Sequence, residues 1–408
     1  MTSASKAAPF PIETRRSIWF LNLAHGLDHY VMLIFPTVVL GLEAVYGRPY
    51  AELIALGTAS FVAFGVFSLP AGWLADRWSR RNMMALFYFG CGVSLLAAAL
   101  SPTLIVLAGA LFLLGMFAAI YHPVGMAMLI EASRARGRTL AFNGVCGNLG
   151  VALAAGITAF IAAYFSWRAA FALPALVCVA TGIAYLWIVP DDRHHAAKRK
   201  SSPEVRVSKA LATVIFGLFI VIALGAGLAF NIITVALPKI VDERIQNLSL
   251  EQVGWVATMV LIAGGLAQLA VGRIVEYIAP HFLFVIVTGL LFAGVTWSLF
   301  VTGPMLMVAL TVAMIGLYGQ VTVNDMVIAR YTADAWRGRV YAVRYFLVFI
   351  SAGASVAAIA FFHSRGGFDL VLFVTAIIAF VFFVSTLVLA LLVAKPESRR
   401  AAAAQPAE

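Results

Sequence analysis

The chain has 408 residues, of which 63% are hydrophobic and only 11% are charged, and its mean hydropathy is +0.98. So little polar surface cannot cover a water-soluble globule, which excludes a soluble protein. The net charge of +10 would suit a nucleic acid, but the charges flank long apolar runs, so we expect no nucleic-acid partner and a chain embedded in a lipid bilayer.

The apolar runs are near twenty residues long, which is what a helix needs to cross roughly 30 Å of hydrocarbon. A transmembrane barrel would instead alternate apolar and polar residues in runs of about ten. The sequence therefore predicts an all-α integral membrane protein with twelve transmembrane helices. The expected helices are 17–41, 51–75, 82–100, 103–130, 138–165, 168–189, 209–236, 250–275, 281–301, 304–329, 338–363 and 369–394.

A polar stretch after the sixth predicted helix divides the chain. The expected parts are an N-terminal tail at 1–16, a six-helix bundle at 17–189, a linker at 190–208, a second six-helix bundle at 209–394 and a C-terminal tail at 395–408. Basic residues favour the cytoplasmic side of membrane proteins. Placing both termini there collects 22 of the 28 Lys and Arg residues on that side. The residues on the other side are Arg48, Arg168, Lys239, Arg244 and Arg365, and Arg344 falls inside a helix.

The two halves repeat one another at an offset of about 200 residues, which is typical of a duplicated six-helix unit. Three pairs of segments match in order. They are Phe35-Pro36 with Leu237-Pro238, Gly72 to Asp76 with Gly272 to Glu276, and Arg136 to Arg138 with Arg337 to Arg339. We expect two bundles related by an axis along the membrane normal, with a cavity between them.

A short charged turn joins the second and third predicted helices, Gly72-Trp-Leu-Ala-Asp-Arg-Trp-Ser-Arg-Arg81. It resembles the loop between helices 2 and 3 of the major facilitator superfamily, Gly-x-x-x-Asp-Arg/Lys-x-Gly-Arg/Lys-Arg/Lys, with Ser79 in place of the second glycine. Together with the twelve helices, the linker and the repeat, the resemblance runs from about Arg16 to Lys395. It implies a secondary transporter whose helices 1, 4, 7 and 10 line a central cavity.

The same resemblance implies a conformational latch at this turn. Asp76 is expected to face the start of helix 11 when the halves close on the inside, where a helix N-terminus favours a carboxylate. The alternative is that Asp76 only neutralises arginines of its own loop. The residues expected in the latch are Gly72, Asp76, Arg77, Arg80, Arg81, Glu276, Arg337 and Arg339.

Ionisable residues are rare inside the predicted helices, where a charge costs about 2.5–3.5 kcal/mol, and they usually face a cavity or a partner. His25, Asp28 and His29 share one face of helix 1, and His122 lies at comparable depth in helix 4. Asp28 and His122 are expected to hold and release a proton, since each changes the charge state of the other. Two alternatives remain: these groups only bond helices together, or His25, Asp28 and His29 bind a metal ion.

Other polar and aromatic residues are candidates for the wall of the substrate cavity. They are Tyr30, Tyr121, Asn231, Gln320, Asn324 and Asp325. The stretches His25 to Asp28 and Tyr121 to Pro123 are similar to parts of the fosmidomycin-resistance type of efflux protein. The glycines at 144–156 resemble the helix 5 motif of the superfamily's antiporters, although the usual proline is missing, and both resemblances favour export.

The sequence thus predicts a secondary transporter that moves a small organic solute across a bacterial inner membrane in exchange for protons, as a monomer and without a cofactor. It contains no phosphate-binding Walker loop, so an ion or solute gradient must supply the energy. One alternative is a proton-coupled uptake symporter. The other is a membrane-embedded metalloenzyme that uses His25, Asp28, His29 and His122.

Thiol labelling tests the predicted topology. After replacement of Cys91, Cys146 and Cys178, single cysteines are introduced as Ser201→Cys and Asn247→Cys. An impermeant thiol reagent added outside intact cells should label only position 247, because the linker is expected inside. Labelling of position 201 would refute the orientation.

Overall fold

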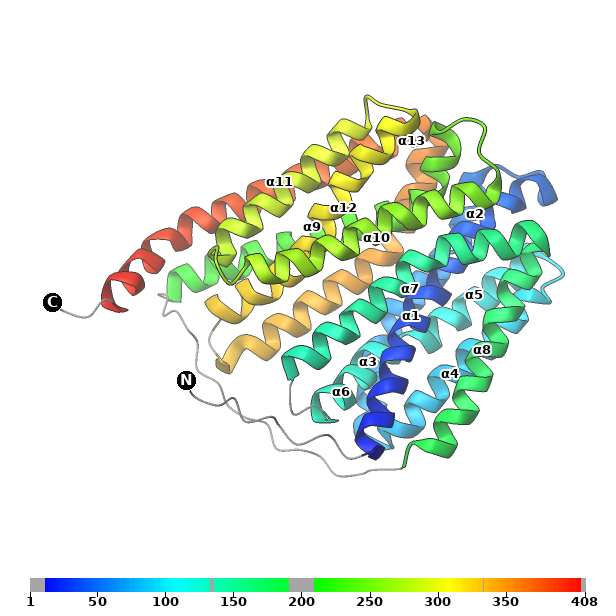
Figure 1. Ribbon diagram of the computed structural model, residues 1–408, viewed down its shortest axis with the longest axis horizontal. Helices are drawn as coiled ribbons and strands as arrows, with labels where there is room; N and C mark the ends of the chain where they lie inside the picture. Colours follow the sequence, from blue (N-terminus) through cyan, green and yellow to red (C-terminus); the bar gives the residue numbers. More distant parts are fainter. Residues whose placement is uncertain (1–11, 133–135, 191–208, 333, 405–408) are drawn as a thin grey trace.

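The computed structural model describes residues 12–132, 136–190, 209–332 and 334–404, and every regular element in these ranges is a helix (Figure 1). The first half contains α1 (Ile12–Tyr46), α2 (Tyr50–Ala55), α3 (Thr58–Arg77), α4 (Arg80–Ala99), α5 (Leu104–Ala118), the π-helix η1 (Tyr121–Gly125), α6 (Met126–Ala132), α7 (Arg136–Tyr164) and α8 (Trp167–Ile188). The second half contains α9 (Lys209–Arg244), α10 (Leu250–Ile274), α11 (Pro280–Ser298), α12 (Gly303–Tyr331) and α13 (Asp334–Ala404).

Eleven helical segments of the described chain are long and apolar enough to span a membrane. The last of them covers 52 residues, Val343–Ala394, which at 1.5 Å per residue is about twice the length that one crossing needs. Gly366 and Gly367 break the helical backbone inside it, and Gly367 takes a left-handed conformation with φ of 57°. α13 therefore carries both the eleventh and the twelfth predicted helices, and the predicted fold class is confirmed.

The predicted fourth helix, 103–130, is not one continuous α-helix. It consists of α5, a π-helical turn that contains Pro123, and α6. Proline has no backbone N–H and its ring displaces the carbonyl four residues earlier, so the regular hydrogen-bond ladder cannot continue through it. Single π turns inside helices are often found at functional sites. This one places Tyr121 and His122 at the centre of the first half.

The two halves are built alike, as the repeat predicts. α1 packs against α7 and α4 against α8, and in the second half α9 and α11 pack against α13. Between the halves, α7 lies along α10 and α3 lies along α13 (Figure 1).

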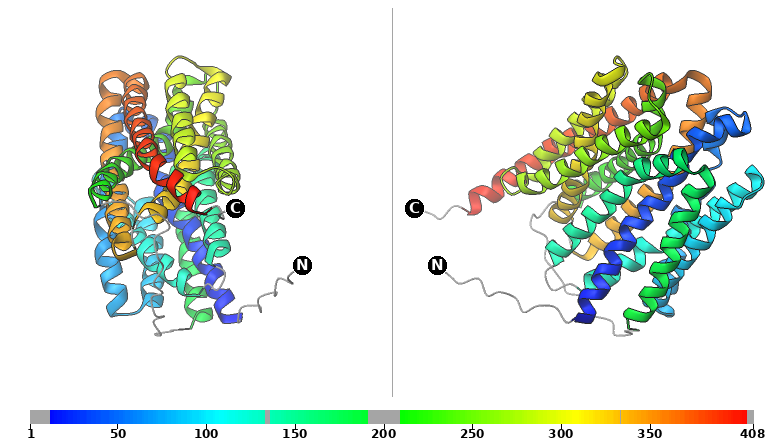
Figure 2. Two further views of the ribbon diagram at one scale, coloured as in Figure 1. Left: turned by 90° about the vertical axis from the view of Figure 1, so that its left-hand side faces the viewer. Right: turned by 45° about the vertical axis from the view of Figure 1, so that its right-hand side comes forward.

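We call the end of the bundle with the loop after Arg77 the basic end, and the end with the turn at Gly47 the far end. The helices of the two halves lie closest at the far end and diverge toward the basic end (Figures 1 and 2). At the far end Lys239 of α9 pairs with Glu43 of α1. The Tyr164 hydroxyl of α7 donates to Glu251 of α10 at 2.8 Å.

Small residues let α7 and α10 approach closely near the far end. The Gly156 N–H donates to Thr258 Oγ1 at 3.0 Å, and that hydroxyl donates to the Ala152 carbonyl at 2.6 Å. A Cβ at Gly254 would lie 2.4 Å from the Ala159 Cβ and 2.7 Å from the Ala155 carbonyl oxygen. Close packing of this kind holds membrane helices together. The hydrophobic effect does not drive their association, because the surrounding lipid is as apolar as the helices.

A Gly254→Val substitution should therefore keep the halves apart at the far end. The measurement is crosslinking of Tyr164→Cys to Glu251→Cys by a short bifunctional thiol reagent in a background without native cysteines, and Gly254→Val should slow it several-fold. Gly272→Val is the matched control, since it lies on the same helix and its Cβ would meet nothing within 4 Å. Equal crosslinking rates in the two variants, with unchanged thermal stability, would show that the close approach at Gly254 is dispensable.

Candidate functional site

The structure brings the four predicted titratable residues together in the first half. Asp28 is fully buried, and neither of its carboxylate oxygens has a hydrogen-bond partner among the described residues. His122 Nε2 lies 3.4 Å from Asp28 Oδ2. A single carboxylate of α1 thus faces a single imidazole from the π turn.

The imidazoles of His25, His29 and His122 form what we call the histidine cluster. The Nε2 atoms of His25 and His29 are 3.2 Å apart, and the His122 ring centroid is 5.5 Å from each of the other two. One nitrogen from each of the three rings lies within 4.8 Å of the others, near enough for the three to be candidate ligands of one ion, whereas only His25 and His29 are within hydrogen-bond distance of each other. A structural zinc site has four ligands, and Asp28 is not part of this group, so the metal alternative stays open without being favoured.

Asn143 of α7 orients the histidine cluster, although the sequence did not single it out. The His25 Nδ1–H donates to the Asn143 carbonyl at 2.8 Å, and a carbonyl only accepts, so Nδ1 carries a proton. The nitrogen left to face His29 in neutral His25 is then the acceptor Nε2. The Asn143 amide also bonds the Tyr121 hydroxyl and Asn22 Oδ1 at 2.9 and 3.0 Å.

Tyr121, a predicted cavity residue, packs against His25, and its role at a substrate site stays a prediction. It is fully buried and its ring stacks on the His25 ring with centroids 4.8 Å apart. The glycines at 144–156 of α7, which we call the glycine stripe, let α1 come close enough for this packing. A Cβ at Gly147 would lie 2.6 Å from the His25 ring, and a Cβ at Gly150 would lie 2.1 Å from the Gly26 carbonyl oxygen.

Phe349 of α13 connects the second half to this site. Its ring centroid lies 5.3 Å from that of His122 and 5.4 Å from that of Phe64 on α3. A Cβ at Gly65 would lie 2.9 Å from the Phe349 carbonyl oxygen, so the two backbones nearly touch here. Neither phenylalanine could be distinguished from the other aromatic residues in the sequence.

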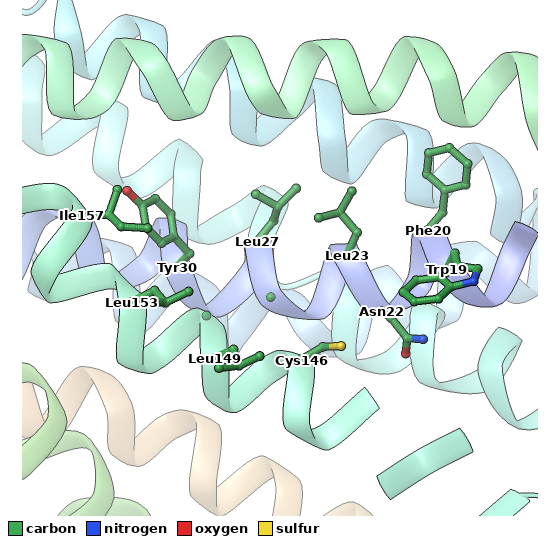
Figure 3. Close-up of a pocket in the computed structure, with 12 residues that line it drawn as sticks. Trp19, Phe20, Asn22, Leu23, Leu27, Tyr30, Cys146, Leu149, Leu153 and Ile157 are labelled. Carbon is green, nitrogen blue, oxygen red and sulfur yellow. The ribbon is translucent and has the colours of Figure 1, made fainter. Parts of the chain in front are cut away.

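Tyr30 does not join the histidine cluster. It lies five residues after His25, about 140° further round the helix, and lines a groove on the other side of α1 (Figure 3). Tyr30 therefore lies apart from the titratable groups, and its role as a substrate-cavity residue stays a prediction.

The remaining predicted cavity residues lie on α9 and α12 of the second half. Gln320 and Asn324 are buried, and their side-chain carbonyl oxygens have no hydrogen-bond partner in the part of the chain that the structure describes. The Asn231 amide donates to the Gly227 carbonyl at 2.8 Å, and Asp325 pairs with Arg344 of α13. Their role at a substrate site stays a prediction.

At the basic end, the predicted latch residues of the first half make contacts within that half. Arg80 bonds Asp76 at 2.8 Å and Glu131 at 2.5 Å, and Arg77 lies over the Trp73 ring. Arg81 donates to the carbonyls at the end of α8.

Ser79 caps α4 with an extended backbone, which explains why this position needs no glycine. A Cβ at Gly72 would touch Pro123 at 3.2 Å, and Glu276 is exposed. The side chains of Arg337 and Arg339 lie outside the described part of the chain. The contact of Asp76 with helix 11 is expected only when the basic end closes, and it stays a prediction.

Comparison with known proteins assigns this architecture. Residues 18–245 and 219–408 match the family model described as Major Facilitator Superfamily, so the match extends over both halves. The chain belongs to the major facilitator superfamily. This family and the named relatives are transporters. We therefore assign the chain to the transporters and not to the enzymes.

Two relatives from this superfamily are named for small organic compounds. A "Probable 4-methylmuconolactone transporter" of Cupriavidus pinatubonensis is 28% identical over 57% of this chain and 56% of its own length. The 4-hydroxybenzoate transporter PcaK of Pseudomonas aeruginosa is 27% identical over 46% of this chain and 42% of its own. The matches thus span about half the length of these curated relatives.

Two solved structures of transporters share the fold. A bacterial homologue of the human lysosomal transporter Spinster, in an inward-facing and unoccupied conformation, superposes with a TM-score of 0.76 and 11% identity over 95% of this chain and 99% of its own. A POT family transporter in complex with 5-aminolevulinic acid gives a TM-score of 0.71 and 13% identity over 93% and 96%. At this identity the likeness shows the fold alone.

The Asn143 network yields a stability prediction. Asn143→Ala keeps the carbonyl that holds His25 but removes the amide that bonds Tyr121 and Asn22. Leaving the buried Tyr121 hydroxyl without this partner should lower the free energy of unfolding by about 1–3 kcal/mol. The check is thermal unfolding of the purified protein in detergent.

Two matched variants show whether the orphaned hydroxyl is the cause. Adding Tyr121→Phe to Asn143→Ala should recover part of the loss, because the hydroxyl is then gone. Asn148→Ala, which removes a half-buried amide bonded to Gln268 at 2.7 Å, should cost less. Strictly additive losses from the two substitutions would contradict the network.

Proposed function

We propose that the chain is a proton-coupled secondary transporter that exports a small organic acid by alternating access. It works as a monomer in a bacterial inner membrane, with both termini in the cytoplasm. Membership of the superfamily supports transport, and the relative named for 4-hydroxybenzoate supports an aromatic carboxylate as the kind of solute. The fosmidomycin-type resemblance and the glycine stripe of α7 favour export.

The observation that carries proton coupling is the burial of Asp28 without a hydrogen-bond partner among the described residues. An isolated carboxylate charge in a low-dielectric interior is very costly, and such a group avoids the cost by taking a proton. His122, 3.4 Å away, offers an imidazole that can receive that proton when water enters. The pair therefore fits the role of a site that binds a proton in one state and releases it in the other.

Alternating access supplies the two states. The helices of the two halves lie closest at the far end and diverge at the basic end (Figures 1 and 2). With cytoplasmic termini, this arrangement is the inward-facing state, in which solute binds from the cytoplasm. Phe349 and Phe64 contact the site from the interface of the halves, so separation of α3 from α13 at the far end would change the surroundings of His122.

Substitution of Asp28 tests this coupling. In proteoliposomes, Asp28→Asn should abolish uphill transport of 4-hydroxybenzoate driven by a pH gradient and leave exchange of labelled for unlabelled solute partly intact, because exchange moves no net proton. Glu52→Gln, which removes an exposed carboxylate paired with Arg48 at the far end, is the control and should transport normally. If Asp28→Asn and His122→Gln both transport uphill like the parent, coupling lies elsewhere.

Proteoliposomes also distinguish the proposed exporter from the alternative uptake symporter. An exporter that exchanges solute for protons accumulates solute in vesicles whose interior is acidic, whereas an uptake symporter accumulates it in vesicles whose interior is alkaline. Stoichiometric zinc or iron in the purified protein would instead favour the metalloenzyme alternative at the histidine cluster.

A further inference from the structure

A groove of about 510 Å³ runs between α1 and α7, and we call it the lateral groove (Figure 3). Nearly all of its lining atoms are apolar. The residues that shape it are Trp19, Leu23, Leu27, Leu149, Leu153 and Ile157. Its size is within the range of ordinary ligand sites, roughly 300–1,000 Å³.

The lateral groove lies on the side of α1 away from the histidine cluster. Successive residues turn by about 100° round a helix, so Leu23 and Leu27 point to the side of α1 opposite His25. On α7, Gly147 faces His25 while Leu149 is 45% exposed. Trp19 is 58% exposed and Leu23 is 46% exposed, in helices that span the membrane, so the lateral groove opens toward lipid.

The basic end of the lateral groove carries two cations. Arg15 and Arg16 are exposed, and they lie one turn before Trp19 and Phe20 on the same side of α1. Tryptophan is enriched where hydrocarbon meets the headgroups, so Trp19 marks the level at which the apolar groove ends. The guanidinium groups of Arg15 and Arg16 are therefore expected at the depth of the lipid headgroups, next to the basic end of the lateral groove.

We propose that the lateral groove binds one anionic phospholipid, with an acyl chain between α1 and α7 and its phosphate on Arg15 and Arg16. An acyl chain gains little from leaving other lipid chains for an apolar groove, because both surroundings are hydrocarbon. The groove therefore supplies shape and the two arginines supply selectivity. Guanidinium groups bind phosphate oxygens through paired N–H donors, and clustered basic residues at membrane depth favour anionic lipids.

Native mass spectrometry of the purified protein tests the selectivity, with phosphatidylglycerol and phosphatidylcholine of identical acyl chains as probes. The parent should retain phosphatidylglycerol about tenfold more tightly than phosphatidylcholine, as expected for two nearby cations. Arg15→Gln/Arg16→Gln should reduce phosphatidylglycerol to the phosphatidylcholine level. Arg77→Gln/Arg273→Gln removes two exposed arginines from the basic ends of α3 and α10, away from the groove, and should leave the preference unchanged.

Tryptophan quenching tests the position of the chain. Phosphatidylglycerol with brominated acyl chains should quench the parent more than Trp19→Phe, and Leu149→Trp, which fills the groove, should displace both lipids. The proposal is overturned if Arg15→Gln/Arg16→Gln keeps the preference, if the control pair loses it equally, or if Leu149→Trp retains lipid like the parent. Unchanged thermal unfolding of each variant separates these outcomes from loss of fold.

Discussion

The structure of the first half depends on burying a carboxylate, Asp28, inside hydrocarbon. A buried charge must be neutralised, paired or hydrated. The helices that surround Asp28 place polar groups near it. The π turn at Pro123 brings His122 to 3.4 Å from the carboxylate. Glycines of α7 let α1 come close enough for Asn143 to fix His25. Helix irregularity and small residues, which weaken soluble helices, are here what make a polar site in the membrane possible.

Much of the fold followed from the sequence, because a membrane imposes few and strict rules. Helix number came from the length needed to cross hydrocarbon, and the six-plus-six arrangement came from the repeat. His25, Asp28 and His29 were placed together because i, i+3 and i+4 share a helix face. The depth of His122 came from its distance to the end of its helix, although the form of the π turn did not, since proline predicts a break without specifying its geometry.

The side-chain surroundings could not be predicted, for one physical reason. Lipid and protein core are both apolar. The residues of α1 therefore do not show which face of the helix contacts lipid and which face packs against other helices. The sequence thus did not show that Tyr30 lines the lateral groove, away from the histidine cluster. Asn143 was hidden in a glycine-rich stretch, and only the structure shows that it is 1% exposed and bonded to His25 through its backbone. Phe349 was one aromatic residue among many until α13 was seen to lie along α3.

The contacts at the far end determine how easily the halves would separate in the proposed alternating-access cycle. Lys239 is buried, but the carboxylates of Glu43, Asp242 and Glu243 that surround it are about one third exposed, and ion pairs with so much access to solvent contribute little to stability. Among these ion pairs, separation of the halves would break only that with Glu43, because Asp242 and Glu243 lie on the same helix as Lys239 and would stay beside it, so the net cost of opening would be small. The glycine contacts of α7 and α10 are likewise short in range and carry no covalent or metal link. The same α1 that carries Glu43 at its far end holds Asp28 on one face and the lateral groove on the other. In the proposed mechanism, a change in the protonation of Asp28 acts on α1, and the same helix carries Glu43, which pairs with Lys239 at the far end.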